Sequence, residues 1–450
     1  MKLRLARREF LTLSGLAAAG AVLAACAPPT AAPATDEAGE PTMESIELIW
    51  DTFRGTGTGW NEERIDTFTE MHPNVSIEFR PLTGSSQQDN YGKMYALFAA
   101  GDLGDICAFD PSHYHFWRAI DKSIIGPLDE YVAAEGLDLA EWFDTFMRLQ
   151  YFNGQLYGLP SWGWAGFDTL VTNALHFEEA GVDLPDPVGH ETSMATIAEW
   201  AHLLRDEDQG RFGLAISHSE ANMVVLCRAF GGYLINEEGT QSMLMDSAES
   251  QEAMRWAYQL SVEDQVLPSP DDIGGSFGAA LLAGKLAMNW CGSLCVRNFD
   301  RDIEDTNVAM ASQILLPTRA DGRYPSQIRG GTWNILANTP HPSESFKFLM
   351  HITSTEGSYG FNVVAGNGAL VRPDVVDQLI ADNPIHQWFI PNLENGIPAH
   401  APANSRGREY TDAVAQWTAL LLDRHQPVPF EEGLQNLHDN IQKVLDQDPA

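Results

Sequence analysis

The chain has 450 residues, of which 62 are acidic and 27 are basic, so its formal net charge is -35. A surface this acidic repels phosphate groups, which excludes nucleic acid as a partner and argues against binding of the folded body to anionic lipid headgroups. The hydrophobic fraction of 44% and the 12 tryptophans are typical of well-filled interiors, and the chain is too long for a single core.

The first element is a short apolar segment behind a basic start. Residues 11–25 are apolar and follow basic residues between positions 2 and 8. The segment is shorter than the roughly twenty residues that cross a bilayer, and it has the layout of a secretory signal. Its end, Leu23-Ala24-Ala25-Cys26, resembles the lipobox of bacterial lipoproteins. That resemblance implies removal of residues 1–25 and lipidation of Cys26, which tethers the protein outside the cytoplasmic membrane.

The basic start also carries a possible export signal. Arg7-Arg8-Glu9-Phe10-Leu11 resembles the twin-arginine signal, although Ala6 and Thr12 depart from its usual flanking residues. Folded export and the ordinary Sec route both stay open. Residues 26–43 contain four prolines and no apolar periodicity, which predicts a disordered tether.

Alternating strands and helices follow the tether. The sequence predicts a βαβ unit in a parallel sheet. Its parts are a strand at 46–50, a glycine-rich loop, a helix with Phe68 on its apolar face and a strand at 75–79. Asp110 follows the next strand, 105–109, at the end where open α/β sheets present ligand contacts. Helices are also expected near 194–204 and 247–260. The last helix carries one packing stripe made of Phe430, Leu434, Leu437, Ile441 and Val444.

Five motifs together carry a family resemblance. They are 68–75, 91–110, 153–160, 172–181 and Ala283-Gly284-Lys285-Leu286-Ala287-Met288 with Gly292-Ser293. In this order and spacing they resemble the extracellular solute-binding proteins of ABC importers, of the maltose-binding-protein-like, carbohydrate-type family. The resemblance covers almost the whole chain after the tether.

The resemblance implies an α/β fold with two discontinuous lobes, of the type II periplasmic-binding-protein-like class, joined by hinge crossings. Crossings, where the chain passes from one lobe to the other, are expected near Pro160, near Leu316-Pro317 and near Ser343. Lobe 1 would then comprise residues 44–160 and 317–342, and lobe 2 residues 161–316 and 343–450.

The implied function is capture of a small solute between the lobes and its delivery to the membrane subunits of an ABC permease. A mono- or oligosaccharide is the expected solute, the receptor is expected to be a monomer, and no cofactor, metal or catalytic residue is expected. Two alternatives stay open: a receptor of the same fold for a non-sugar solute, and an extracellular glycoside-processing enzyme.

Sugar sites combine aromatic faces with carboxylates, amides and arginine. The candidate ligand-binding residues are therefore Trp60, Asp110, Trp162, Trp164, Gly331, Trp333, Arg372, Tyr410 and Arg408. Each has a structural alternative. Trp60 could staple a helix start, Asp110 could cap a helix before Pro111, and Trp333 could be strand core. One of Trp162 and Trp164 is expected in the core. Leu294 stands where the family often has an aromatic residue, which argues against a maltodextrin-like ligand.

Sequence patterns for catalysis or metal binding are weak. Gly274-Gly275-Ser276-Phe277-Gly278 fits a nucleophile elbow but follows an acidic, proline-rich loop, so a helix start is the better interpretation. His113 and His115 lack further ligands at metal spacing. The four remaining cysteines, Cys107, Cys227, Cys291 and Cys295, are predicted to be buried small apolar residues.

Overall fold

The computed structural model describes residues 44–111, 114–166, 169–183, 192–291, 310–315, 319, 322, 324–365, 371–382, 393, 396–398, 400, 402, 404 and 406–448. The body, Ser45–Ala450, is a unit separate from Met1–Glu44. The predicted signal and tether, together with His113, Leu294 and Cys295, lie outside the described residues.

The first part of the chain forms a βαβ unit, as the sequence predicts. Strands β1 (Ile46–Thr52) and β2 (Val75–Pro81) are parallel, in register from Ile46 with Val75, and α1 (Trp60–Met71) connects them. Helix α2 (Gln87–Ala100) ends at Gly101, whose φ of 72° is left-handed and suits glycine. Strand β3 (Ile106–Cys107) then pairs parallel with β1.

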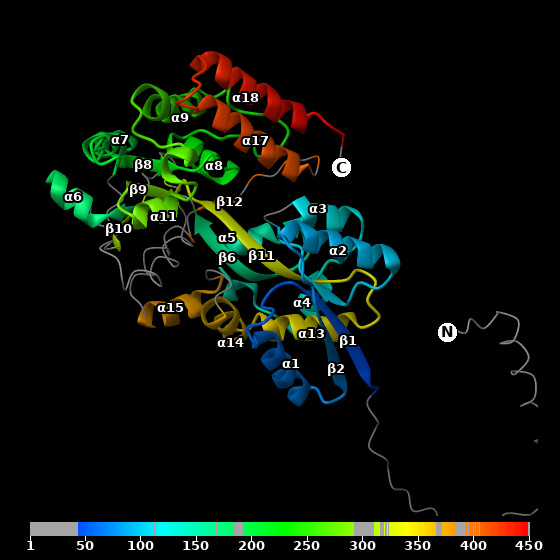
Figure 1. The fold of residues 1–450 in the computed structure, drawn as a ribbon. Helices are drawn as coiled ribbons and strands as arrows, with labels where there is room; N and C mark the ends of the chain where they lie inside the picture. The colour runs from blue at the N-terminus through cyan, green and yellow to red at the C-terminus, as the bar shows by residue number, and fades with distance from the viewer. Residues whose placement is uncertain are drawn as a thin grey trace, which may run out of the picture. The chain divides into compact units, whose positions relative to one another are not determined.

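Short elements lead from β3 to the first crossing (Figure 1). They are α3 (Tyr114–Asp121), α4 (Asp129–Glu135), the 3₁₀ turn η1 (Leu139–Glu141), α5 (Asp144–Leu149), and the hairpin β4 (Tyr151–Phe152) and β5 (Gln155–Leu156). Strand β6 (Leu159–Gly166) follows and lies antiparallel to β11 (Gln327–Ile335) over most of its length. Strand β11 also pairs with β3 and with β12 (Ile397–Pro398), so the described strands of this sheet run β12-β11-β3-β1-β2, with β6 beside β11.

The middle of the chain builds a second sheet. Its described strands run in the order β10-β7-β9-β8. The elements here are β7 (Thr169–Asn173), α6 (Ala174–Ala180), α7 (Met194–Leu203), β8 (Phe212–Ile216), α8 (Glu220–Ala229), α9 (Ala248–Tyr258), the π-turn η2 (Gln259–Glu263), α10 (Pro270–Ile273), α11 (Phe277–Leu282), β9 (Leu286–Cys291) and β10 (Met310–Leu315).

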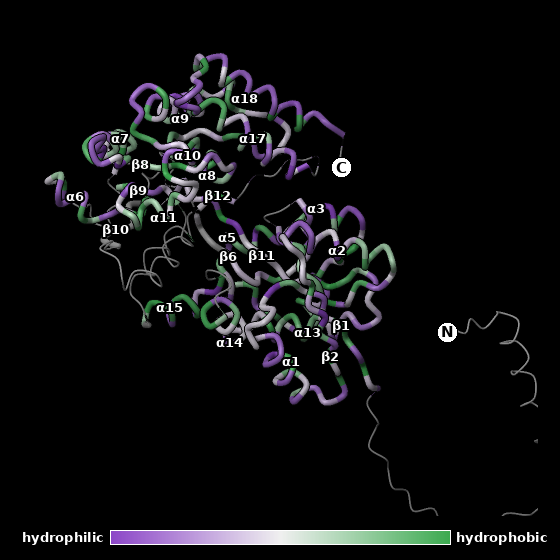
Figure 2. The backbone as a smooth tube through the Cα atoms, viewed as in Figure 1, coloured by the Kyte–Doolittle hydropathy of each residue, from purple (hydrophilic) through white to green (hydrophobic). Residues whose placement is uncertain are grey.

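Two terminal helices pack against each other and against helices α8 and α9. They are α17 (Gly407–Leu421) and α18 (Phe430–Leu445). Figure 2 shows hydrophilic and hydrophobic stretches alternating along both. The predicted stripe from Phe430 to Val444 is buried in the same core as Leu214, Met223 and Trp290, which confirms its packing role.

The helices after β11 pack on the first sheet, whereas the division predicted from the sequence places them in the second lobe. They are α13 (Pro342–Ile352), α14 (Thr355–Tyr359), the π-turn η4 (Gly360–Val364) and α15 (Pro373–Asp382). Phe348 of α13 and Val375 of α15 share a core with Leu48 and Trp50 of β1. Residues 343–365 and 371–382 therefore cover the first sheet, although the boundary at Ser343 assigns them to the second lobe. An amphipathic helix reveals that it has a buried face, but not which sheet it covers.

Candidate functional site

A buried carboxylate lies at the carboxyl end of β3. Asp110 is 0% exposed. Its Oδ2 accepts hydrogen bonds from Arg54 Nη2, from Gln87 Nε2 at 3.0 Å and from Tyr91 Oη at 3.0 Å. The backbone N–H of Thr332 approaches its Oδ1 at 3.4 Å. A buried charge needs this many partners, so Asp110 organises the end of the sheet.

The cation in this cluster comes from the loop after β1. The loop places Gly55, Gly57 and Gly59 at φ of 70°, 78° and 79°, which only glycine adopts freely. Arg54 precedes these turns, and its guanidinium lies 4.7 Å from the Phe53 ring centroid and 4.9 Å from that of Trp162. The ion pair with Asp110 and the two aromatic faces fix the guanidinium in one position.

Trp162 reaches this cluster because Gly331 has no side chain. The two residues pair across β6 and β11. A Cβ on Gly331 would lie 1.8 Å from Trp162 Nε1 and 2.6 Å from Asp110 Oδ1. Trp162 Nε1 is buried and has no hydrogen-bond partner among the described residues. The backbone of Trp164 pairs with Arg329, and its side chain lies outside the described part of the structure.

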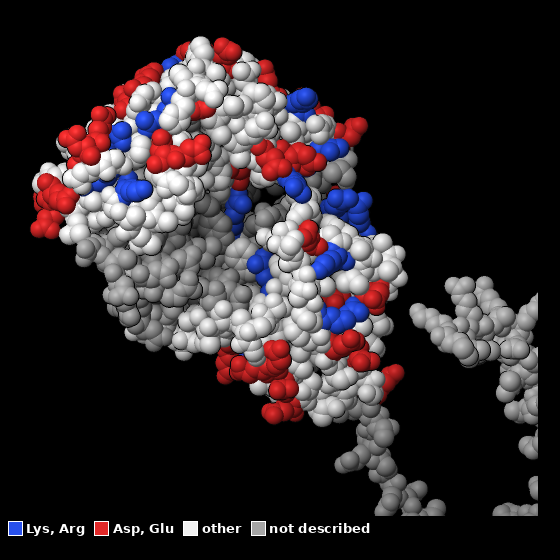
Figure 3. All heavy atoms as spheres, viewed as in Figure 1, with Lys and Arg blue, Asp and Glu red and all other residues white. Residues whose placement is uncertain are grey.

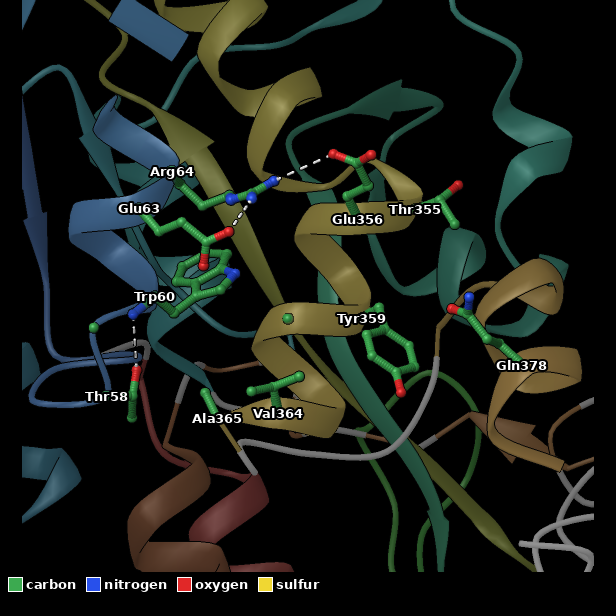
Figure 4. A pocket seen from close by; sticks show the side chains of 12 residues that line it. Thr58, Trp60, Glu63, Arg64, Thr355, Glu356, Tyr359, Val364, Ala365 and Gln378 are labelled. Atoms are coloured by element: carbon green, nitrogen blue, oxygen red, sulfur yellow. Dashed lines mark hydrogen bonds and ion pairs between the residues drawn. The ribbon is translucent and has the colours of Figure 1, made fainter. Parts of the chain in front are cut away.

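A pocket of about 480 Å³ opens in the first lobe beside the start of α1. Figure 4 shows its lining side chains coming from α1, from the α14–η4 segment and from α15. The lining residues are Thr58, Gly59, Trp60, Glu63, Arg64, Thr355, Glu356, Tyr359, Gly360, Val364, Ala365 and Gln378. The wall therefore combines aromatic and aliphatic faces with hydroxyl, amide and charged groups.

Trp60 belongs both to this pocket and to the core beneath it. Its side chain is 3% exposed, and its Nε1 donates to Gly357 O at 3.0 Å. Gly360 lets the ring approach, since a Cβ there would lie 2.9 Å from Trp60 Cδ1. Trp333 is 1% exposed and packs edge-on against Trp50 at 5.3 Å. The Trp333 side chain thus occupies the core of the first lobe, which is the alternative to ligand binding that the sequence left open for this residue.

The charges at the pocket mouth are also paired. Arg64 Nη2 donates to Glu63 at 2.7 Å, and Arg64 Nη1 lies 3.9 Å from Glu356 (Figure 4). Arg64 is 5% exposed, whereas Glu356 reaches into solvent. The basic group is thus a fixed part of the wall.

The other three candidates have structural partners in this conformation. Arg372 is 4% exposed, pairs with Glu141 at 2.9 Å and Asp374 at 3.1 Å, and lies over the Trp142 ring. Tyr410 is 1% exposed in the core of the second lobe, where burial raises the pKa of its phenol well above its usual value. Arg408 is exposed and lies 3.6 Å from Asp412.

Four residues around Asp110 were not among the candidates: Arg54, Gln87, Tyr91 and Thr332. Arg54 could have been found, because it follows β1 at the same sheet edge as Asp110. Tyr91 gave a misleading signal, since it occupies the apolar face of α2. Burial raises the pKa of its phenol well above the usual value, so it stays a hydrogen-bond donor to Asp110.

The weak catalytic and metal patterns have structural explanations. Ser276 caps α11 by accepting a hydrogen bond from Ala279 N, which confirms the helix start. His115 is 2% exposed and bonds Tyr95 and Gln88, each at 3.0 Å. Within the described ranges, no three His, Cys, Asp or Glu side chains group to hold a metal ion.

Three of the four cysteines that follow Cys26 lie among the described residues. Cys107 and Cys227 carry free thiols and are buried, and Cys291 is buried as well, as predicted. None of the described helices has the length and apolar character needed to cross a membrane.

Comparisons with known proteins place the fold. The chain resembles the solved structure of the sugar-binding protein MalE from Xanthomonas citri, with a TM-score of 0.72 and 15% identity, covering 89% of this chain and 97% of that one. UgpB from Mycobacterium tuberculosis, in complex with glycerophosphocholine, gives a TM-score of 0.70 at 16% identity, with 89% and 98% covered. An ABC substrate-binding protein from Listeria monocytogenes, in complex with cycloalternan, gives a TM-score of 0.69 at 16% identity. The match covers 89% of this chain and 99% of that one.

No curated protein matches this chain in sequence. The structural neighbours establish a two-lobed, periplasmic-binding-protein-like α/β fold. The model of the family described as bacterial extracellular solute-binding protein matches residues 63–386. This is a family of binding proteins rather than enzymes. Because the match spans well over half of the sequence, the chain belongs to the family of bacterial extracellular solute-binding proteins.

Proposed function

We propose that this chain is a lipid-anchored receptor that captures a mono- or oligosaccharide between its two lobes and delivers it to an ABC permease. The observation that carries the proposal is the arrangement of Arg54, Asp110 and Trp162 at the carboxyl end of the first sheet. An indole and a fixed polar pair at one point offer an apolar ring face and directed hydrogen bonds, which sugars require.

The charge balance favours an uncharged solute. The Arg54 cation is offset by Asp110, and the Arg64 cation by Glu63. The described side chains of the site therefore hold no surplus positive charge for an anion. Figure 3 shows Asp and Glu spread over the outer surface of one face, with a hollow beside which Lys and Arg appear. Polar pairs of this kind serve hydroxyl groups as donors and acceptors.

The anchor and lobe division complete the proposal. Residues 1–25 act as the signal, Cys26 carries the lipid and residues 26–43 form the tether. The packing of the helices supports a revised division, in which residues 343–382 join the first lobe and β12 forms the return crossing. The receptor works as a monomer, and lobe closure around the solute gives the form that the permease recognises.

Native mass spectrometry of freshly purified protein, followed by calorimetry with a panel of saccharides, tests the proposal. We expect a co-purified or panel saccharide bound one to one and released unchanged. The panel includes glycerophosphocholine, because UgpB is a structural neighbour. Binding of that or another non-sugar solute, with no saccharide bound, would replace the sugar assignment.

A further inference from the structure

Helix α8 of the second lobe holds the crossing strands through its last turn. Arg228 is 0% exposed. Its Nη1 donates to Ile397 O at 2.9 Å and its Nη2 to Pro398 O at 2.8 Å, both on β12. Nη1 also reaches Ser326 O, next to β11, at 3.5 Å. One side chain thus binds the backbone of two different crossings.

The first turn of α8 makes a second connection. Glu220 is 5% exposed and pairs with Arg329 of β11. Arg329 Nε in turn donates to Gln327 Oε1 at 2.8 Å, which orients the guanidinium. Ser219 caps this helix end, where the helix dipole favours a negative side chain. The two connections are eight residues apart on α8, about 12 Å along its axis.

The same crossing strands carry the candidate site. Gly331, which makes room for Trp162, lies two residues after Arg329 on β11. Strand β12 joins β11 in parallel, with Gln327 opposite Ile397. The position of α8 is therefore linked to that of the site through a few residues of one strand.

We propose that Glu220 and Arg228 are positioning residues that fix the second-lobe end of β11 and β12 on α8, so that lobe closure bends the strands beyond Arg329. The next stretch of β11 is suited to bending. Gly330 lies opposite Gly163 of β6, and the register shifts between Gly331 and Thr332. Glycines and register shifts weaken a strand locally.

Burial makes the Arg228 connection strong. Burial lowers the pKa of the Arg228 guanidinium to about 9, so it stays charged at neutral pH. A charged donor bound to carbonyls in a dry interior resists displacement by water. Arg228→Met would keep much of the side-chain length but remove every donor. Arg228→Lys would restore a charge and part of the hydrogen bonding.

The test measures distances between two nitroxide labels, at Glu70→Cys on α1 and Gln435→Cys on α18, in full-length protein without added solute. Cys26 and Cys295 are replaced by serine, and the buried Cys107, Cys227 and Cys291 remain. We expect a broader distance distribution for Arg228→Met and for Glu220→Gln. Arg228→Lys and Glu220→Asp should return it toward the parent width.

Glu431→Gln is the matched control, because it breaks the exposed Arg255–Glu431 pair inside the second lobe. We expect that variant to keep the parent distribution. An unchanged distribution in folded Glu220→Gln and Arg228→Met would overturn the proposal. Should Arg228→Met fail to fold, Glu220→Gln decides the question in the same way, with Glu220→Asp as its conservative variant. This measurement does not depend on the identity of the solute, so its failure is distinct from failure of the proposed function.

Discussion

Arg54 lies with its guanidinium 4.9 Å from the centroid of the Trp162 ring while one of its terminal nitrogens binds Asp110. The two residues come from β6 and from the loop after β1, which are more than a hundred positions apart in sequence. Their contact combines an aromatic face and a directed cation at one edge of the sheet.

Gly331→Ala should displace Trp162. The added Cβ would lie 1.8 Å from Trp162 Nε1, and overpacking of this kind costs about 1–3 kcal/mol of unfolding free energy. We expect roughly tenfold weaker solute binding as the indole moves. Calorimetry and urea unfolding measure the two effects. Gly92→Ala is the control, because a Cβ at this exposed position of α2 meets nothing within 4 Å. Equal affinity in both variants would contradict the role of Gly331.

Asp110→Asn should weaken both binding and folding. The substitution removes the charge that Arg54, Gln87 and Tyr91 share, and hydrogen bonds to a buried charge contribute about 1.5–3 kcal/mol. Urea unfolding and calorimetry are the measurements. Asp412→Asn, which disrupts an exposed pair with Arg408, should change stability by less than about 0.5 kcal/mol. A loss no larger in Asp110→Asn than in this control would exclude an organising role.

The unfolding free energy should fall as the pH drops from 7.5 to 5.5. Burial lowers the pKa of His176, His218 and His351 below the usual 6.5. The unfolded chain therefore binds protons more readily below pH 6.5, which removes stability on acidification. Above pH 6.5 the three imidazoles are neutral in both states and stability is fully present. Urea titrations at several pH values give the slope.

His176 offers a way to assign part of that slope. Its Nε2 lies 3.1 Å from Gly284 O, and Arg211 Nη1 lies 2.7 Å from its Nδ1, so the neutral ring donates to the former and accepts from the latter. His176→Gln removes the titrating group and should reduce the slope between pH 5.5 and 7.5. A slope equal to that of the parent would show that His176 does not contribute.

Cys107 and Cys227 should resist thiol reagents in the native protein. Both are buried, burial raises the pKa of the Cys227 thiol to about 12, and it raises that of Cys107 well above the usual value. Because the thiolate is the reactive form, modification should follow unfolding. Peptide mapping after alkylation, with and without denaturant, measures this. Rapid labelling of either residue in the folded protein would contradict the packing.

Cys26→Ser should release a folded, solute-binding protein from the membrane fraction. The acidic body offers little attraction to anionic lipid, so attachment should depend on the lipid at Cys26. Fractionation and immunoblotting of cells that express the parent and the variant give the result. Ser14→Ala, within the signal, serves as a control that should stay attached. Continued membrane association of Cys26→Ser would refute an anchor at this residue.

Local patterns in the sequence were enough to predict local structure. The βαβ unit from β1 to β2 and the stripe from Phe430 to Val444 each depend on the spacing of neighbouring apolar residues. The lobe that receives α13 was not predictable, because Phe348 meets Trp50 only after the chain has returned to the first sheet. The predicted crossing near Ser343 places α13 in the second lobe, whereas α13 packs on the first sheet.

The candidate site was predictable in one respect. Asp110 could be selected from its place after a strand. Its partner Arg54, 56 positions away, could have been selected in the same way because it follows β1, whereas Tyr91, 19 positions away, has the sequence signal of a core residue on the apolar face of α2. Tryptophans were over-selected, since Trp333 fills the core. Burial of an indole depends on which face of a strand looks inward, and the sequence leaves that choice open where both faces carry large residues.

The tryptophans beneath the pocket give this protein a built-in optical reporter. Trp60, Trp50 and Trp333 lie with ring centroids 5.3 to 6.3 Å apart, and Trp60 also forms part of the pocket wall. Such closely spaced indoles exchange excitation, so a solute that touches Trp60 would alter the emission of the whole group. Intrinsic fluorescence can therefore screen solutes without a label, at concentrations far below those that calorimetry requires.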